Sequence, residues 1–457
     1  MTQPASFRDP GGRLFRRDGR IFRQVHSTGL ASLDAALGSK AVRAEIERGR
    51  FVKTEIVSRD AHGALLEHEA IPFPSFPYEW PPEMLHAAAQ LTIDLALSLA
   101  EEGLGIKDAT PFNVLFRGPH PVFVDLLSIE PRGPRDPLWL ARAQFIRTCL
   151  LPLAAERDFT LPLSQSLFAR EGIEPETFYR MLSRAGRFSP KYLSLVSMPV
   201  WMGARKPDDA SIYQPRQLDD PEKAAFVYRA GLRALQKSLA RFAPAARQSN
   251  WTNYMAAECS YTPGQFAEKE RFVVDALREF APKRVLDAGA NTGHFSALSS
   301  RAGASVVSID ADSASAGQIW RRARAENLDV LPLVVNLAQP TPATGWRNRE
   351  CSSFLERAAG AFDCVMMLAV VHHLLATERV PLAEILDLAA DLTRDLALIE
   401  FVDFEDPMFR RLSRGRDHLY RHFDAALFER ESSIRFELLR KLAISGSRRT
   451  LFLLRKK

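Results

Sequence analysis

The sequence predicts an α/β protein with two folded parts. From residue 284 onward, apolar strands alternate with helical segments, which is typical of a parallel sheet with helices on both faces. Near the end of the chain, two β-rich segments follow each other closely and predict an antiparallel hairpin that closes this sheet. Residues 203–223 are polar, contain proline and lack periodicity, so they separate this half from an α+β half before it.

The C-terminal half is expected to be a doubly wound, mostly parallel seven-stranded sheet. Helices are predicted at 292–303 and 313–327, between the first three strands. Five strands should be parallel, and the last two segments should form the hairpin: 284–288, 305–310, 329–335, 362–369, 395–401, 434–445 and 448–456.

The N-terminal half reads as a mixture of strands and helices. Apolar positions at helical spacing predict a helix over 83–103, and residues 137–196 look helical with prolines between segments. Short strands are expected at 19–25, 51–58, 64–70 and 121–128. The predicted domains are an N-terminal α+β domain with a helical extension, a linker with a helix, and a C-terminal domain, at 1–202, 203–249 and 250–457.

Composition and charge narrow the class of protein. No apolar run approaches the ~18 residues that a membrane-spanning helix needs. The first twenty residues lack the apolar core of a secretory signal, so a cytoplasmic location is expected. The four cysteines form no CxxC pair, so neither a disulfide framework nor a metal site is expected. The net charge is +6 with an arginine excess near the end, which permits RNA or anionic lipid as a partner, although a solvated surface is the commoner reading.

The segment "DAGANTG" at 287–293 indicates a nucleotide site. Gly289 and Gly293 allow backbone torsions that other residues avoid and a close approach to a ligand, and Asp310 ends the next strand, where it can accept hydrogen bonds from ribose hydroxyls. A dinucleotide site needs the middle glycine of GxGxxG, which is missing here, and Asp287 would repel a phosphate. A cationic nucleoside such as S-adenosylmethionine (SAM) fits better.

Four segments together resemble the class I SAM-dependent methyltransferases: "VLDAGANTGHFS", "VVSIDAD", "FDCVMMLAVVHHL" and "LALIEF". The resemblance covers residues 250–457. It implies that Asp287 lies near the methionine amino group, that Gly289 and Gly293 frame the methionyl part, that Asp310 binds the ribose and that Asn336 faces the adenine, with SAM as cofactor. It extends the predicted cofactor site to Asn291, Leu368, Tyr254 and Tyr261.

The candidate catalytic residues follow the fourth and fifth strands of that sheet. His372 and His373 should lie where an acceptor approaches, and either imidazole can take a proton near neutral pH. Glu400 closes the fifth strand and is expected to orient a histidine or the substrate, or to pair with an arginine. The alternative for each histidine is a structural role in the core or at a loop.

Two further segments are expected to border this site. Aromatic residues before the first strand, Trp251, Tyr254 and Tyr261, are followed by Lys269, and aromatic faces attract a sulfonium cation. Packing between domains is the alternative. The long connection at 336–350 is typical of a substrate-binding loop, in which Trp346 and Arg347 are the residues expected to select the acceptor.

The first half contains a second constellation. Asp108 and Asn113 stand as DxxxxN, and Asp125 ends the following strand. In phosphoryl transfer, one Asp orients the acceptor hydroxyl while an Asn and a second Asp hold magnesium. Residues 20–155 partly resemble protein-kinase-like and aminoglycoside-phosphotransferase-like folds. The resemblance is incomplete because no glycine-rich phosphate loop is visible, "DLL" replaces "DFG", and Lys53 is only the best candidate for the ATP lysine. It implies a degenerate module that binds a partner or the acceptor, with an active kinase and a chance match as the alternatives.

The function predicted from these patterns is SAM-dependent methyl transfer to a small molecule, sugar or glycoconjugate. One alternative is an RNA methyltransferase that uses the arginine-rich tail. Another is a non-catalytic regulatory protein whose two domains bind ligands without turnover.

Overall fold

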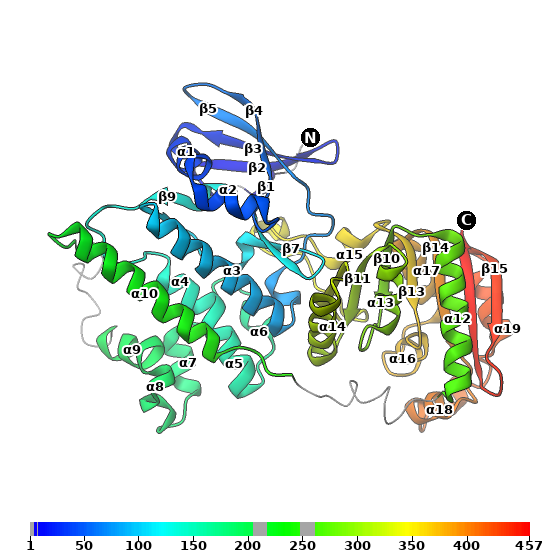
Figure 1. Cartoon of the computed structure of the whole chain (residues 1–457). Coiled ribbons are helices and arrows are strands. Elements are labelled where there is room, and N and C mark those ends of the chain that lie inside the picture. Colours follow the sequence, from blue (N-terminus) through cyan, green and yellow to red (C-terminus); the bar gives the residue numbers. More distant parts are fainter. Residues whose placement is uncertain (1–3, 7, 204–216, 247–260) are drawn as a thin grey trace. The chain divides into compact units, whose positions relative to one another are not determined.

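The computed structural model describes residues 4–6, 8–203, 217–246 and 261–457. The chain forms two compact units, Met1–Ala245 and Ala246–Lys457 (Figure 1). Each unit is described separately below. Trp251 and Tyr254 lie outside the described residues.

The first unit begins with a five-stranded antiparallel sheet in the order β1-β2-β3-β5-β4. Three of these five strands were predicted. The short β1 was missed, and so was β2 together with the two-residue turn that joins it to β3. That turn, Asp18-Gly19, has positive φ at both positions, as a tight hairpin requires. The strands are β1 (Pro4–Ser6), β2 (Gly12–Arg17), β3 (Arg20–His26), β4 (Thr54–Arg59) and β5 (Gly63–His68).

Two small hairpin-like sheets and a set of helices complete this unit. The predicted strand over 121–128 ends earlier, at Phe123, and Asp125 lies just beyond it. The small sheets pair β6 (Leu104–Ile106) with β9 (Ile129–Pro131) and β7 (Val114–Arg117) with β8 (His120–Phe123). The helices are α1 (Leu30–Gly38), α2 (Lys40–Glu47), α3 (Pro82–Glu101), α4 (Arg142–Phe145), α5 (Leu151–Phe159), α6 (Leu163–Leu167), α7 (Pro175–Met181), α8 (Pro190–Tyr192), α9 (Met198–Gly203) and α10 (Pro221–Arg241).

Helix α10 follows the polar segment that the sequence marks as a linker. Asp220 caps it, because its carboxylate accepts from the backbone N–H groups of Glu222 and Lys223. The helix packs on α3, where Gln236 Nε2 donates to Asp94 Oδ1 at 2.8 Å. Helix α10 is therefore part of the first unit.

The second unit is built on a seven-stranded sheet in the order β12-β11-β10-β13-β14-β16-β15. The first five strands in this order are parallel, and β16 and β15 are antiparallel to their neighbours, which confirms the predicted mostly parallel sheet with a final hairpin. The strands are β10 (Arg284–Ala288), β11 (Ser305–Asp310), β12 (Val330–Val334), β13 (Phe362–Met367), β14 (Thr393–Val402), β15 (Phe436–Ala443) and β16 (Arg449–Lys456).

Helices cover both faces of this sheet (Figure 1). On one face, Leu398 of β14 and Leu453 of β16 share an apolar core with α12, α13 and α14. On the other face, Phe428 of α19 packs on Phe401 and Phe452, with ring centroids 5.2 and 4.6 Å apart. The helices are α12 (Pro263–Phe280), α13 (His294–Arg301), α14 (Ser313–Glu326), α15 (Phe354–Ala358), α16 (Val371–Ala376), α17 (Leu382–Leu392), α18 (Pro407–Ser413) and α19 (Ala425–Ser432).

Successive side chains of a strand point to opposite faces of the sheet, and this alternation fixes the direction of two charged side chains. Glu400 is two residues after Leu398, and Arg449 is two residues before Leu451, so both side chains point to the face that α12 covers. Strand β10 lies between β11 and β13, so the order of strands reverses there, where open α/β sheets bind ligands.

Candidate active site

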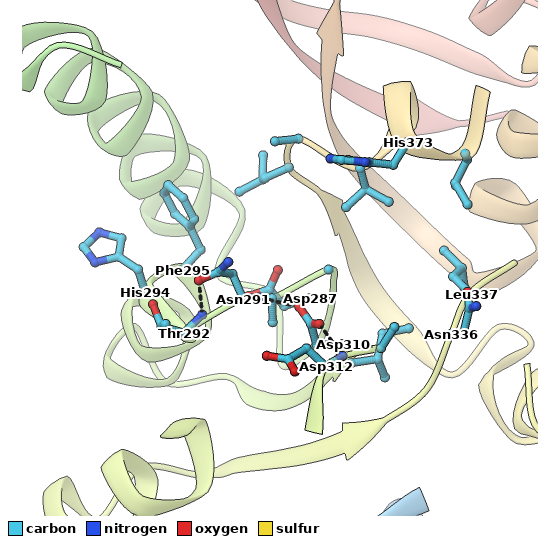
Figure 2. Close-up of a pocket in the computed structure, with 18 of the residues that line it drawn as sticks. Asp287, Asn291, Thr292, His294, Phe295, Asp310, Asp312, Asn336, Leu337 and His373 are labelled. Atoms are coloured by element: carbon cyan, nitrogen blue, oxygen red, sulfur yellow. Dashed lines mark hydrogen bonds between the residues drawn. The ribbon is translucent and has the colours of Figure 1, made fainter. Parts of the chain in front are cut away.

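A cavity of about 510 Å³ lies at the carboxyl ends of the parallel strands of the second unit (Figure 2). This volume is within the range of small-molecule sites. Eight residues that the sequence singled out as cofactor-binding or catalytic line it: Tyr261, Asp287, Gly289, Asn291, Asp310, Asn336, Leu368 and His373. Gly293, His372 and Glu400 do not line it.

The loop after β10 makes a tight turn against the end of β11. Gly289 has a φ of +71°, and a Cβ at this position would lie 2.3 Å from Val370 Cγ2. The N–H groups of Gly289 and Ala290 both donate to the Ile309 carbonyl, at 2.8 and 3.0 Å. Glycine is therefore required at 289 by both torsion and space.

Gly293 has a structural place next to this loop. It precedes α13 with a φ of +75°, and a Cβ there would lie 2.8 Å from Ile319 Cγ1 on α14. The sequence marks Gly293 as a cofactor residue, whereas the geometry explains the glycine by its positive φ and its close approach to Ile319.

Asp310 ties the end of β11 to two backbone segments. Its Oδ2 accepts from the N–H of Asn291, and its Oδ1 accepts from the N–H of Asp312, each at 2.8 Å. Burial raises the pKa of the Asp310 carboxyl to about 6, against these hydrogen bonds, which lower it. The carboxylate is thus held in one orientation at the cavity wall (Figure 2).

Asp287 is the last residue but one of β10 and is only 3% exposed, although it lines the cavity. Its Oδ2 accepts from Ser296 Oγ at 2.5 Å, and Ser308 Oγ donates to Ser296 Oγ at 2.7 Å. Burial raises the pKa of Asp287 to about 6, while Ser296 and the ammonium of Lys269 act in the opposite direction.

Glu400 is fully buried and does not line the cavity, but it hydrogen-bonds three side chains that do. The Tyr261 hydroxyl donates to Oε1, Lys269 Nζ donates to Oε2 at 2.5 Å, and Arg449 Nη1 donates to Oε1 at 3.2 Å. Burial alone would raise the pKa of Glu400, but Lys269 and Arg449 outweigh it and hold the pKa below its usual range. The prediction offered an arginine partner as one option, and Arg449 is that partner.

Arg449 is a site residue that sequence reasoning missed. It begins β16, and its Nε donates to Asp406 Oδ2 at 2.9 Å while its guanidinium lies 4.7 Å from the centre of the Tyr261 ring. An arginine at the head of the apolar run "TLFLL" was a possible signal. The register of the hairpin cannot be derived from the sequence, so the position of Arg449 opposite Val402, beside Glu400, could not be predicted.

The two histidines after β13 face different surroundings. His373 lines the cavity, across from Asp310 in Figure 2, and burial together with Arg449 lowers its pKa. His372 is 1% exposed and does not reach the cavity; its ring lies 4.3 Å from that of His373 and 6.5 Å from Phe409. Burial lowers the pKa of His372 well below its usual value, so this imidazole is neutral.

Three further residues were predicted to contact the cofactor or the acceptor: Asn336, Trp346 and Arg347. Asn336 lines the cavity, and its Oδ1 accepts from the N–H of Ala338 at 2.9 Å, which fixes the amide in the turn after β12. Trp346 is 63% exposed, and neither it nor Arg347 lines the cavity.

Comparison with known proteins identifies the group to which this chain belongs. A family model described as "Methyltransferase domain" matches residues 234–437. The nodulation protein NoeA of Rhizobium meliloti (strain 1021) is 30% identical over 461 residues, which cover 98% of this chain and 94% of NoeA. The chain belongs to the NoeA family. It carries a methyltransferase domain in its C-terminal region, and the alignment with NoeA spans both units.

Solved structures similar to this NoeA-family chain match less than half of it. They include the N-methyltransferase NodS from Bradyrhizobium japonicum WM9, at 12% identity, with 43% of this chain and 99% of NodS covered and a TM-score of 0.32. The magnesium protoporphyrin IX methyltransferase ChlM from Synechocystis PCC 6803, with bound SAH, matches at 19% identity, 42% and 84% coverage and a TM-score of 0.31. The bifunctional kinase-methyltransferase WbdD matches at 19% identity, 44% and 41% coverage and a TM-score of 0.32.

The polar residues predicted in the first unit lie near one another, and each of them hydrogen-bonds protein groups. Asp125 Oδ1 accepts from Arg23 Nη1 at 2.8 Å, and Asp125 Oδ2 accepts from the Ser128 hydroxyl. Asn113 Nδ2 donates to the Asp108 carbonyl at 2.9 Å. Burial raises the pKa of Asp108, and Asp125 contributes in the same direction. Lys53 is exposed.

None of the described helices combines the length and apolarity needed to cross a membrane. Within the same residues, no group of three or more His, Cys, Asp or Glu side chains is placed to hold a metal ion.

Proposed function

We propose that this NoeA-family protein is a SAM-dependent methyltransferase that acts on a small molecule, a sugar or a glycoconjugate. The observation that carries the proposal is the Asp310 carboxylate, which two backbone N–H groups hold at the wall of a cavity located where the strand order reverses. Carboxylates at this place recognise the two hydroxyls of a ribose.

The other walls fit the rest of such a cofactor. Asp287 offers a carboxylate for an ammonium group, and the turn at Gly289 and Asn291 brings backbone close to the ligand. Asn336 and Leu368 are the residues that we assign to the adenine side. A cation is favoured here over a phosphate, because carboxylates of Asp287, Asp310 and Asp312 all reach the cavity.

SAM supplies an activated methyl group on a sulfonium. The chain's own residues align the acceptor and exclude water from the site. His373 faces the cavity, and its lowered pKa keeps the imidazole neutral at pH 7, so that it can accept a proton from an acceptor hydroxyl or ammonium. We assign no contact with the acceptor to His372 or Glu400, because neither lines the cavity.

The proposal is tested by calorimetric titration with S-adenosylhomocysteine (SAH). Wild type should bind it, and Asp310→Asn should bind it 10- to 100-fold more weakly, about 1.5–3 kcal/mol, the range for hydrogen bonds to a charged group. The exposed Asp329, at the start of β12, provides the matched control Asp329→Asn, which should bind as wild type does. Equal affinity of Asp310→Asn and wild type would contradict the ribose assignment. Binding of SAM with no consumption in the presence of any acceptor would favour a regulatory protein instead.

For the first unit we propose a degenerate kinase-like module without phosphoryl transfer. The ion pair between Arg23 and Asp125 supports this, because the guanidinium occupies a carboxylate oxygen that a magnesium ion would need. Asn113 Nδ2 donates to the Asp108 carbonyl and to Ser128 Oγ, and Asp108 Oδ1 accepts from Gln144 Nε2, so these side chains also bind protein groups.

A further inference from the structure

The cavity in the second unit receives charges of both signs from different elements. Asp287 and Asp310 come from the ends of β10 and β11, whereas Lys269 comes from the middle of α12 and Arg449 from the start of β16. The carboxylates have a role in the proposed function, and the two cations do not. Both cations are deeply buried, with exposed fractions of 4% for Lys269 and 2% for Arg449, yet both line the cavity.

Two carboxylates that do not line the cavity hydrogen-bond these cations. Glu400 binds both Lys269 and Arg449, and Asp406 binds Arg449, but neither carboxylate lines the cavity. The four formal charges sum to zero. Of these four groups only the cations reach the wall, so the cluster presents its positive side to the cavity, where the Asp287 carboxylate, whose pKa Lys269 lowers, also lies.

Lys269 and Arg449 do not use all of their N–H donors on other described residues, so donors are left for a ligand. An ammonium has three N–H donors, and among the described residues Lys269 uses one, to Glu400. A guanidinium has five, and Arg449 uses three of them in bonds to Glu400 and Asp406 and a further one to the Tyr261 hydroxyl, which leaves one for a ligand. The rings of Tyr261 and Phe295 each lie 5.1 Å from Lys269 Nζ, so the ammonium is held between aromatic faces and Glu400.

We propose that Lys269 and Arg449 form an anion-binding subsite for a carboxylate or phosphate group inside this cavity. The inference rests on the proposed function, since it assigns part of the same site. Two ligands can supply the anion: the amino-acid carboxylate of the cofactor, or an anionic group on the methyl acceptor. Charge-assisted N–H donors fixed by Glu400 and Asp406 are preorganised for such a group in either case.

The cofactor as source is tested with two ligands that differ at the amino-acid end. SAH has the carboxylate, and 5′-methylthioadenosine lacks the whole amino-acid part. If the subsite binds the cofactor's carboxylate, Lys269→Met should lose 10- to 100-fold in affinity for SAH and less than twofold for 5′-methylthioadenosine, measured by calorimetry. The exposed Lys283 gives the matched control Lys283→Met, which should bind both ligands as wild type does.

The acceptor as source is tested with inorganic phosphate on the full-length protein saturated with SAH. If the subsite is open to the acceptor, millimolar phosphate should raise the melting temperature of SAH-bound wild type and of Lys283→Met, but not of Lys269→Met. If Lys269→Met fails to fold, wild type alone decides between the two sources. If the subsite binds the cofactor's carboxylate, phosphate should weaken the binding of SAH but not of 5′-methylthioadenosine. If the subsite is open to the acceptor, phosphate should stabilise the SAH complex further.

The proposal is overturned if phosphate neither weakens the binding of SAH to wild type nor stabilises the SAH complex of wild type. Where Lys269→Met folds, it must in addition bind both nucleosides as wild type does. Failure of the proposed function looks different. Wild type would then bind neither nucleoside, while the phosphate titration of the ligand-free protein and of Lys269→Met would still report on the anion subsite. Stabilisation of wild type by phosphate that Lys269→Met lacks would support the subsite even then.

Discussion

The backbone N–H of Asn291 donates to Oδ2 of Asp310 at 2.8 Å, which joins the loop after the first parallel strand to the end of the second. Asn291 has a φ of +49°, a left-handed conformation that asparagine tolerates better than most residues. The same carboxylate reaches the cavity, so the group proposed to bind the ribose also holds the loop in shape. Ligand binding and loop geometry should therefore depend on the charge of Asp310 together.

SAH affinity should fall in acid. The pKa values of Asp287 and Asp310 are both raised to about 6 by burial, and a ribose and an ammonium favour the ionised forms. Below pH 6 these carboxyls must lose protons on binding, so affinity should fall about tenfold per pH unit for each group, and should be constant above pH 7. Calorimetry between pH 5 and 8 measures this dependence. In Asp310→Asn, the slope of the logarithm of SAH affinity against pH should correspond to about one proton fewer than in wild type. Constant affinity of wild type down to pH 5 would contradict the assignment.

Without ligand, the same two groups affect stability with the opposite slope. Their folded-state pKa values lie above the ordinary value of 3.8, so the native state binds more protons than the unfolded chain between about pH 4 and 6. Their contribution to the free energy of unfolding therefore decreases as the pH rises through this window.

Gly289→Ala should impair both the loop and ligand binding. A Cβ at this position would lie 2.3 Å from Val370 Cγ2, in addition to the torsional strain of a φ of +71°. We expect at least a tenfold loss of SAH affinity by calorimetry and a lower melting temperature. Gly303→Ala is the matched control, because Gly303 also has positive φ but has nothing within 4 Å of the added Cβ.

The double variant Gly289→Ala/Val370→Ala separates the two causes. It removes the Val370 methyl groups that the new Cβ meets, so part of the affinity should return. If Gly289→Ala behaves like Gly303→Ala, the close approach to Val370 has no role in the site.

Mg-ATP should not stabilise the first unit. Both carboxylate oxygens of Asp125 accept protein hydrogen bonds, from Arg23 and Ser128, which leaves this residue poorly suited to bind a metal ion. In a thermal-shift assay of the full-length protein, ATP with magnesium should give the same melting temperature as ATP without it. A magnesium-dependent rise in melting temperature that Asp125→Ala abolishes would show that the Arg23–Asp125 pair opens. It would also show that the first unit still binds magnesium with ATP.

The fold of the second unit could be predicted from sequence because its strands are buried on both faces. Near-continuous apolar runs such as "RVLDA" and "SVVSID" mark the strands, and "DAGANTG" marks the turn between strand and helix. The strands of the first unit were harder because β2, "GRLFRR", is basic and mostly exposed or half-buried. The Asp18-Gly19 turn was the available signal for that hairpin, since paired positive φ values favour this dipeptide.

Side-chain directions at the site were the part that sequence could not supply. His372 and His373 are neighbours in the chain, but the helical geometry of α16 sends only His373 to the cavity. The position of Arg449 beside Glu400 depends on the hairpin register, which one residue of slip would reverse. The periodicity of apolar residues predicts the strands. The contact between Glu400 and Arg449, which are 49 residues apart, follows only from the assembled sheet.

Replacing Glu400 by glutamine should destabilise the sheet and loosen the cavity wall. The substitution keeps the shape but leaves the buried Lys269 ammonium without its carboxylate, whereas Arg449 retains Asp406. Breaking a buried pair in this way costs about 3–5 kcal/mol. Hydrogen exchange of the β14 and β16 amides in the full-length protein measures the loss locally. The control is Glu429→Gln, which removes an exposed pair with Lys441 and should cost less than about 1 kcal/mol.

The pH dependence gives an independent check on Glu400. Its folded-state pKa is lowered by Lys269 and Arg449 despite burial, so its stabilising contribution should be complete above the ordinary value of 4.5. That contribution should be lost as the pH falls through the folded-state pKa. The difference in β14 protection between wild type and Glu400→Gln should therefore be constant from pH 6 to 8 and shrink in acid below pH 4.5. A difference that does not change with pH would mean that shape, and not charge, makes Glu400 important.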